Sequence, residues 1–138
     1  MSLIKIGIDG LGFENDPLIA YESAKKALSI YDDLEITLVT NQQVIDVAKN
    51  EAIDRLKLIL AKEFATQEDT VSIIRTHNDL SIQIACDLLA KDQIDGLVAS
   101  GNTAITIATA FVKVGTYSNI NKFGLMITMP TMVEGKLV

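Results

Sequence analysis

The residue types best suited to chemistry in this chain lie in the segment Ser100-Gly101-Asn102-Thr103. This segment combines two hydroxyls and a carboxamide with a glycine, which lets a ligand approach the backbone closely. An apolar run with helical spacing follows, so the segment lies where a helix begins. Backbone amides at a helix start, together with hydroxyl donors, can hold a phosphate or a developing oxyanion without a lysine. The structural alternative is that Ser100 or Asn102 merely caps the helix.

A second candidate segment is Asp9-Gly10-Leu11-Gly12, which places a carboxylate at the end of an apolar run. Its glycine amides can approach a ligand closely. The dinucleotide spacing G-x-G-x-x-G is absent because Asn15 stands at the third position, and G-x-x-x-x-G-K-[ST] does not occur. The sequence therefore supports neither NAD nor P-loop nucleotide binding. A structural interpretation is equally open, since Asp9 can cap backbone amides of its own turn.

The chain has one histidine, His77, and one cysteine, Cys86. This count excludes an intrachain disulfide, a cysteine cage for a metal ion and a conventional His-rich metal site. His77 lies in a polar segment ahead of a predicted helix, so we expect a role in the loop or at the helix start. Cys86 lies near the buried side of an amphipathic segment and is predicted to be a packed apolar residue. We expect no metal ion and no cofactor.

Length and composition narrow the possible classes of protein. The 138 residues predict one domain, and 49% apolar with 22% charged residues is typical of a globular chain. The net charge is −6 and only two basic residues are arginines, so we expect no nucleic-acid binding. The most apolar stretch, residues 97–112, is too short to cross a bilayer. No secretory signal is visible at the start of the sequence, so we expect a cytoplasmic location.

Short apolar runs alternate with amphipathic segments along the chain. The apolar runs predict strands at residues 4–9, 35–40, 56–60, 96–100 and 123–128. One helix is predicted after Asp16 and Pro17, which suit its N-cap and first position, and another after Asn41. Residues 62–76 are polar and predict a loop with room for a helical turn.

Two further helices are predicted in the second half of the chain. Asn78 and Asp79 begin the first of them, which ends near Lys91. The second follows the turn at Gly101, and spacing places on its inward face the residues Ala104, Ile105, Ala108, Phe111 and Val112.

This alternation predicts an α/β fold with a parallel sheet and helices on both faces. Ligands of such sheets bind at the carboxyl ends of the strands, where the loops after Asp9 and Ser100 converge if their strands are neighbours. We predict a single α/β domain over residues 1–138. The last residues, 135–138, look like a turn into a strand that stops at once, so we expect the amino-terminal part of a longer protein. A short terminal strand is the alternative.

Several motifs, in their order along the chain, resemble the amino-terminal half of the PlsX family, the phosphate acyltransferases of bacterial fatty acid and phospholipid synthesis. The family opens with a strand that ends in D-A-M-G-G-D, and it also carries the turns S-A-G-N-T-G-A and P-L-P-T. The matching segments here are Ile8-Asp9-Gly10-Leu11-Gly12, Ala99-Ser100-Gly101-Asn102-Thr103-Ala104 and Met129-Pro130-Thr131. The chain departs from the family at Phe13, which replaces the second glycine of the first motif, and in the basic segment R-x-K-x-D-S-S-M, of which Arg75 remains.

The resemblance implies a three-layer αβα fold with a mostly parallel sheet, like that of the isocitrate and isopropylmalate dehydrogenases. It implies acyl transfer from acyl carrier protein, or from an acyl-CoA thioester, to inorganic phosphate, in a cytoplasmic homodimer that needs no cofactor. Any peripheral membrane contact would come from residues outside this chain. The resemblance assigns catalysis to Asn102, Ser100 and Asp9, and phosphate binding to Gly10, Gly12, Gly101 and Thr103.

Two alternatives stay open from the sequence. The altered first turn and the reduced basic segment also suit a diverged relative that forms short-chain acyl or acetyl phosphate in an amino-acid (glycine) reductase type of complex. A catalytically silent scaffold domain is the third hypothesis, since a fold does not determine a function.

Overall fold

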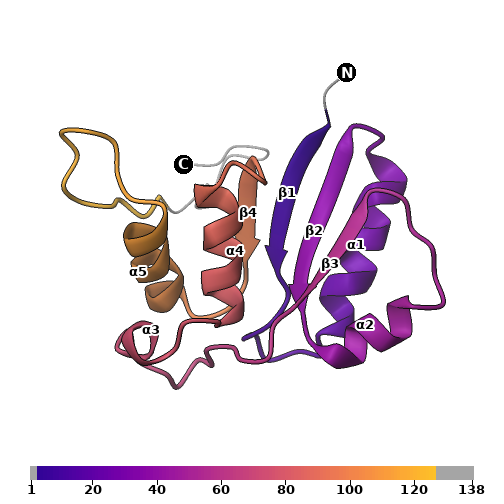
Figure 1. Ribbon diagram of the computed structural model, residues 1–138, viewed down its shortest axis with the longest axis horizontal. Coiled ribbons are helices and arrows are strands. Elements are labelled where there is room, and N and C mark those ends of the chain that lie inside the picture. Colours follow the sequence, from indigo (N-terminus) through magenta and orange to yellow (C-terminus); the bar gives the residue numbers. More distant parts are fainter. Residues whose placement is uncertain (1–2, 127–138) are drawn as a thin grey trace, which may run out of the picture.

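The computed structural model describes residues 3–126. The elements follow one another as β1 (Ile4–Asp9), α1 (Leu18–Ile30), β2 (Leu34–Thr40), α2 (Gln42–Ala48), β3 (Leu56–Leu60), α3 (Ile73–Thr76), α4 (Ser81–Ala90), β4 (Gly96–Ala99) and α5 (Thr103–Lys113). The strands form one sheet in the order β3-β2-β1-β4, and every pairing is parallel (Figure 1). Within residues 3–126 no helix is long and apolar enough to span a bilayer.

The register of the sheet brings two loops together. Asp9, the last residue of β1, pairs with Val39 of β2 on one side and with Ala99, the last residue of β4, on the other. The carboxyl ends of β1 and β4 are therefore neighbours, as the predicted convergence of the two candidate segments required. The chain leaves both strands at the same edge of the sheet (Figure 1).

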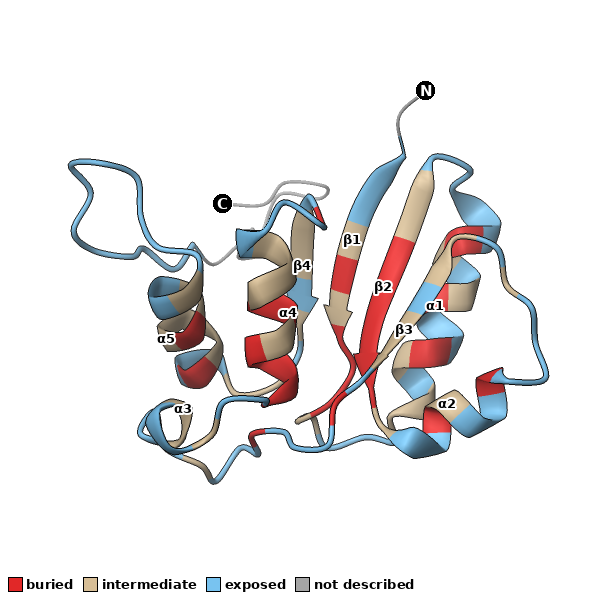
Figure 2. Ribbon diagram, viewed as in Figure 1, coloured by how far each residue is buried: buried red, intermediate tan, exposed pale blue. Residues whose placement is uncertain are grey.

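Helices cover both faces of the sheet, which makes three layers. Helices α1 and α2 pack on one face, α4 packs on the other, and α5 packs against α4 (Figure 1). The strand β2 is buried from Ile36 to Thr40 (Figure 2) because its alternate side chains enter both layers. Ile36 contacts the α1 layer, whereas Val39 lies in the cluster that includes Ala85 of α4. This arrangement confirms the predicted α/β fold with a parallel sheet.

The side chains predicted to cap the first two helices make hydrogen bonds to the helix starts, although α1 begins at Leu18, one residue later than predicted. The Asp16 carboxylate accepts a hydrogen bond from the Leu18 amide at 2.9 Å, and the Asn41 side chain accepts one from the Val44 amide at 3.1 Å. The polar stretch at residues 62–76 contains a single helical turn, α3, as its composition allowed. Each of these features depends on residues close in sequence, which is why sequence patterns identify them.

Helix α4 begins later than predicted. Its first residue is Ser81, not Asn78 or Asp79, and the Leu80 amide donates to the Gln83 side chain at 3.1 Å. The chain before it is held instead by a tertiary contact, since the Ser81 amide donates to the carbonyl of Glu63 at 2.9 Å. A partner 18 positions away explains why the local cap signal was misleading.

The inward face predicted for α5 is wrong in part. Ile105 and Thr109 are buried, but Ala104, Phe111 and Val112 are exposed. The reason is that α5 packs on the neighbouring helix α4, which covers a narrower stripe than a sheet would. The strand predicted at 123–128 is also wrong over its described part, residues 123–126, where Phe123 packs edge-on against Phe111 at a ring distance of 5.0 Å. The segments 129–131 and 135–138 lie outside the described residues.

Arg55 holds the end of α1 to the sheet. It precedes β3 with φ = 66°, and its guanidinium donates to the carbonyls of Leu28, Tyr31 and Leu34 at 2.7–2.9 Å. The last carbonyls of a helix have no partner within the helix, so this side chain supplies donors that the backbone cannot. A planar fork of donors suits three acceptors better than a single ammonium does.

We expect Arg55→Lys to lower the free energy of unfolding by about 1–2 kcal/mol, because an ammonium replaces only part of this set of hydrogen bonds. Urea denaturation measures the change. Arg75→Lys is the matched control, since Arg75 is an exposed arginine at the end of α3. Equal unfolding midpoints for the two variants would contradict the assigned role of Arg55.

Candidate functional site

The two predicted segments meet at the carboxyl edge of the sheet. A methyl group built on Gly101 would lie 3.5 Å from the carbonyl oxygen of Leu11 and 3.6 Å from that of Gly12. The turn after β1 and the turn after β4 are therefore in van der Waals contact. The structure thus places the turn with Gly10 and Gly12 next to the turn with Gly101, the two turns that carry the residues assigned by the resemblance.

Asp9 lies beneath this junction and not on its surface. Its side chain is 4% exposed, and one carboxylate oxygen accepts a hydrogen bond from the Leu11 amide at 3.3 Å. Burial raises the pKa of Asp9 to about 6, an effect that the hydroxyl of Ser81 and the Leu11 amide partly offset. Asp9 therefore caps its own turn, as the structural interpretation required. Its carboxyl group also gains or loses a proton near neutral pH.

Packing requires glycine at positions 10 and 12. A methyl group on Gly10 would lie 2.8 Å from the Leu38 side chain, and the Gly10 amide already donates to the Val39 carbonyl at 2.9 Å. Gly12 has φ = 82°, and a methyl group there would lie 2.5 Å from the carbonyl oxygen of Ala65. The absence of a side chain at these positions is thus explained by the fold alone.

Gly101 differs from both of them. Its φ lies outside the left-handed region, and a methyl group on it would make only ordinary contacts. Packing therefore does not require glycine here, although the position borders the start of α5. The space beside its α-carbon faces the turn after β1, at ordinary contact distance from the carbonyls of Leu11 and Gly12.

Both the oxygen and the nitrogen of the Asn102 carboxamide are hydrogen-bonded. The oxygen Oδ1 accepts from the Ile105 amide at 3.2 Å, which confirms the helix cap considered from the sequence. The nitrogen Nδ2 lies 3.1–3.4 Å from the carbonyl oxygens of Thr66, Gln67 and Asp69. No sequence signal indicated this second set of partners, because they lie more than 30 positions away.

Ser100 and Thr103, which precede Gly101 and follow Asn102 along the chain, are both exposed. In the first turn of α5, Asn102 takes the amides of Ile105 and Thr106, which leaves those of Thr103 and Ala104 directed outward. The available donors at the junction are therefore two hydroxyls and backbone amides of a helix of 11 residues. They form the type of surface that binds phosphate or an oxyanion.

Ser81 was missed by the sequence reasoning. It is 1% exposed, it is the first residue of α4, and its hydroxyl faces Asp9. A serine is a frequent residue at a helix start, which is the signal that could have identified it. The helix was instead expected to begin at Asn78 and Asp79, which placed Ser81 inside the helix. Ser81 connects the Asp9 carboxyl group to α4.

The remaining nucleophile and base candidates are structural. Cys86 is fully buried, and burial together with the nearby Asp9 raises the pKa of its thiol to about 11, which agrees with the predicted packed residue. His77 caps the end of α3, and its Nδ1 lies 2.9 Å from the Thr76 hydroxyl. Among residues 3–126 no three His, Cys, Asp or Glu side chains are arranged to hold a metal ion.

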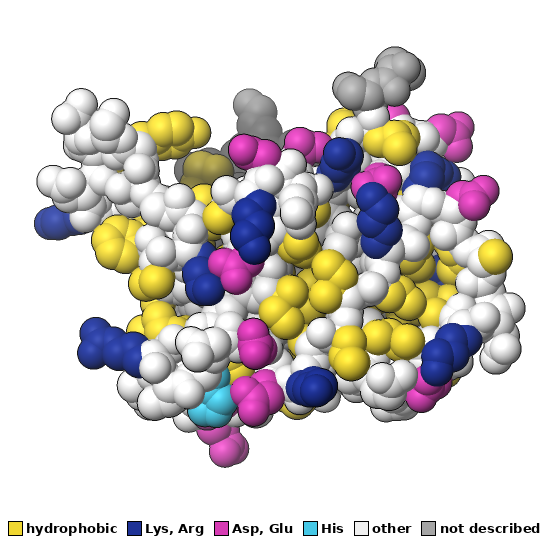
Figure 3. Space-filling model, viewed as in Figure 1, with side chains coloured by type: hydrophobic (Ala, Val, Ile, Leu, Met, Phe, Trp, Pro, Cys, Tyr) yellow, Lys and Arg dark blue, Asp and Glu magenta, His cyan; other side chains and the backbone are white. Residues whose placement is uncertain are grey.

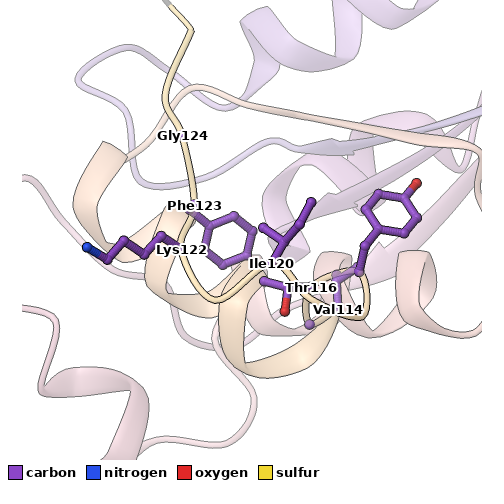
Figure 4. Close-up of a pocket in the computed structure, with 8 residues that line it drawn as sticks. Val114, Thr116, Ile120, Lys122, Phe123 and Gly124 are labelled. Carbon is purple, nitrogen blue, oxygen red and sulfur yellow. The ribbon is translucent and has the colours of Figure 1, made fainter.

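Two hollows of the described surface lie away from this junction. A pocket lined by Val114, Tyr117, Ile120 and Phe123 follows the far end of α5, about 16 Å along the helix axis from Thr103 (Figure 4). A groove between α4 and β3 gathers apolar side chains, with Ile59 and Leu88 in its lining (Figure 3). Neither hollow contains a residue of the two converging turns.

We expect Gly12→Ala to destabilise the chain far more than Gly115→Ala. Both glycines have a positive φ, 82° and 83°, but the region around Gly115 is open. An alanine at a positive φ lowers the free energy of unfolding by about 1–2 kcal/mol at either position. At position 12 the clash with the Ala65 carbonyl lowers it by about 1–3 kcal/mol more. Thermal or urea unfolding of the two variants gives the difference. Equal losses would show that the turn after β1 is not held against Ala65.

We also expect the stability of the chain to depend on the Asp9 carboxyl group. Below about pH 4 both folded and unfolded states carry the proton, so burial costs nothing. As the pH rises from about 4 to 6, the unfolded state loses the proton first and stability falls. Above pH 6 the buried, ionised carboxylate lowers the free energy of unfolding by its full amount, about 3 kcal/mol for a pKa raised from 3.8 to about 6.

Asp9→Asn should therefore unfold at higher urea than the wild type at pH 8 and at the same urea concentration at pH 3.5. The asparagine oxygen can still accept from the Leu11 amide, so the turn keeps its cap. Asp32→Asn, at an exposed carboxyl group, is the control and should not show a gain that grows with pH. A pH-independent effect of Asp9→Asn would refute the buried-carboxyl interpretation.

Comparison with known proteins agrees with the resemblance seen in the sequence. The profile of a family described as fatty acid synthesis protein matches residues 4–138. A phosphate acyltransferase of Ureaplasma parvum serovar 3 is 31% identical over 136 residues, which are 98% of this chain and 41% of the relative. Phosphate acyltransferases of Mesoplasma florum and Streptococcus mutans serotype c are 29% and 30% identical, over 98% and 96% of this chain and 42% and 40% of their own lengths. The chain thus spans about two fifths of the length of these relatives. It belongs to the fatty acid synthesis protein family.

Proposed function

We propose that this chain is the amino-terminal part of an enzyme that transfers an acyl group to inorganic phosphate and forms acyl phosphate for phospholipid synthesis. The observation that carries the proposal is the junction of the turns after β1 and β4, with open donors at Ser100 and Thr103 beside Gly101. The relatives named phosphate acyltransferase support the same assignment.

In the proposed reaction a phosphate oxygen attacks the carbonyl carbon of a thioester. The new C–O bond forms, the C–S bond breaks, and the thiolate leaves and takes up the proton that the phosphate loses. The chemical demand is to orient phosphate and to stabilise the negative charge on the carbonyl oxygen. Hydroxyls of Ser100 and Thr103 and the first amides of α5 would hold the phosphate. Asp9 would orient the turn from below through its bond to Leu11.

The loops at this edge of the sheet carry few basic residues, so within this chain phosphate would be bound by neutral donors and not by a cluster of cations. The loops that leave the strands here carry the acidic residues Glu14, Asp16, Glu63, Glu68, Asp69 and Asp79, against the basic residues Lys62 and Arg75. A phosphate dianion is repelled by such a surplus of carboxylates. We propose that further basic groups come from the remainder of the longer protein.

The proposed donor is acyl carrier protein, with an acyl-CoA thioester as the other source of the same thioester chemistry. By the same resemblance we propose a cytoplasmic homodimer, in which any peripheral membrane contact uses residues outside this chain.

A second candidate reaction is the formation of short-chain acyl or acetyl phosphate in an amino-acid (glycine) reductase type of complex. Two departures from the family pattern favour it: Phe13 follows Gly12 where a second glycine is expected, and Arg75 alone remains of the basic segment. Both changes alter the surroundings of the same site and leave its donors in place. The length of the accepted acyl chain separates the two candidates.

The test is phosphate-dependent release of free thiol by the full-length protein from C2 and C16 thioesters of CoA and of acyl carrier protein. We expect release to require phosphate, with a preference for C16 for the phospholipid role and for C2 for the second candidate. No release by a folded full-length protein would reject both and leave the scaffold hypothesis.

Gly101→Ala makes the test specific for the site. Packing tolerates a methyl group at this position, so the melting temperature should hold. Because that methyl group fills the space between the two turns of the junction, we expect the KM for phosphate to rise about tenfold, equivalent to about 1.4 kcal/mol of binding. Gly124→Ala is the matched control, because a methyl group there meets open space. An unchanged KM for phosphate in Gly101→Ala would remove the junction from the proposed site.

A further inference from the structure

The long connection between β3 and α4, residues 61–80, lies across the carboxyl edge of the sheet. Its only helix is the single turn α3, and long connections with little secondary structure of their own are uncommon in compact domains and are often functional. This one touches both converging turns. The Ala65 carbonyl lies against Gly12, and the carbonyls of residues 66, 67 and 69 face the Asn102 carboxamide.

The turn at residues 66–69 is stabilised by its own hydrogen bonds. The amide and hydroxyl of Thr66 donate to the Asp69 carboxylate at 2.7 and 2.8 Å, and the Asp69 amide donates back to the Thr66 carbonyl at 3.3 Å. These bonds fix the shape of the turn without help from elsewhere. The position of the turn relative to α5 depends on contacts outside the turn, and one of them is the packing of Ala65 in the same buried cluster as Ile105 of α5.

Asn102 supplies the hydrogen bonds that hold the turn to α5. A carboxamide nitrogen carries two hydrogens, and here it faces three carbonyl oxygens, so both hydrogens are engaged. The opposite orientation of the group would direct its oxygen at those carbonyls and its nitrogen at the Ile105 amide. The network therefore allows one orientation only, with Oδ1 on α5 and Nδ2 on the turn.

We propose that Asn102 is a positioning residue, which fastens the 66–69 turn to the start of α5 and thereby makes the 61–80 connection a wall of the site. Its Nδ2 does not serve as the oxyanion donor, because that role would require it to leave the carbonyls. The oxyanion is then left to hydroxyls and backbone amides. The effect on activity rests on the proposed function, whereas the fastening of the turn does not.

Asn102→Asp separates the two ends of the side chain. Aspartate is as good an N-cap as asparagine, so the bond to the Ile105 amide is kept. Its second oxygen replaces Nδ2 and faces the carbonyls of the turn, where it can only repel them. Asn102→Ser keeps a capping oxygen without the added charge and is too short to reach the turn.

Amide hydrogen exchange of the chain measures how firmly the 66–69 turn is held to α5. In both variants we expect amides of residues 66–72 to exchange at least tenfold faster, while the Ile105 amide keeps its protection. Asn41→Asp is the matched control: Asn41 caps α2 through the same oxygen, on the Val44 amide, so its exchange pattern should not change. Unchanged exchange at residues 66–72 in both Asn102 variants would overturn the proposal.

Kinetics of the full-length protein distinguish positioning from direct participation. A positioning role predicts a higher KM for phosphate with less than a tenfold loss of kcat in Asn102→Ser. Loss of an oxyanion donor predicts a fall in kcat of about 10²–10³-fold at saturating phosphate, which would overturn the proposal and uphold the proposed function. If the wild-type protein releases no thiol, the proposed function fails and the exchange result alone decides on the fastening.

Discussion

The parallel pairing of β1 with β2 on one side and β4 on the other is the constraint on which the rest of the structure depends. It places the carboxyl ends of β1 and β4 side by side, so the turns that follow the two strands are neighbours. They pack in van der Waals contact at Gly101, and the Ala65 carbonyl lies so close to Gly12 that no side chain fits there. The candidate site is therefore a consequence of strand order, and segments about 90 positions apart in sequence become its two halves.

Sequence patterns predicted what depends on neighbours along the chain. The caps at Asp16 and Asn41 and the bounds of β1 and β3 follow from signals within a few residues. The start of α4 and the exposed face of α5 did not follow, since the first depends on the Glu63 carbonyl and the second on how α5 meets α4. Hydrophobic periodicity shows that one face of a helix is apolar but not how wide a neighbour covers it.

The same distinction holds for the candidate site. Residue types and the rule on strand ends brought Asp9 and the segment from Ser100 to Thr103 to one place. They did not show that the Asp9 carboxylate would lie beneath the turn, that Ser81 would face it, or that the Asn102 nitrogen would face a turn more than 30 positions away. Those features require the tertiary fold, because each joins groups from different connections.

The polar side chains of the junction divide into those that hold its shape and those that remain free. Asp9 and Asn102, the residues with the most versatile chemistry, are engaged with backbone groups and are therefore rigid. The free donors are hydroxyls and amides, which are neutral and change little with pH. A site of this kind orients an anion and stabilises developing charge without a proton-transfer base of its own, and this matches the demands of phosphate attack on a thioester, whose leaving group accepts the proton. Fixed carboxylate and carboxamide groups beside neutral donors therefore support the proposed acyl transfer to phosphate.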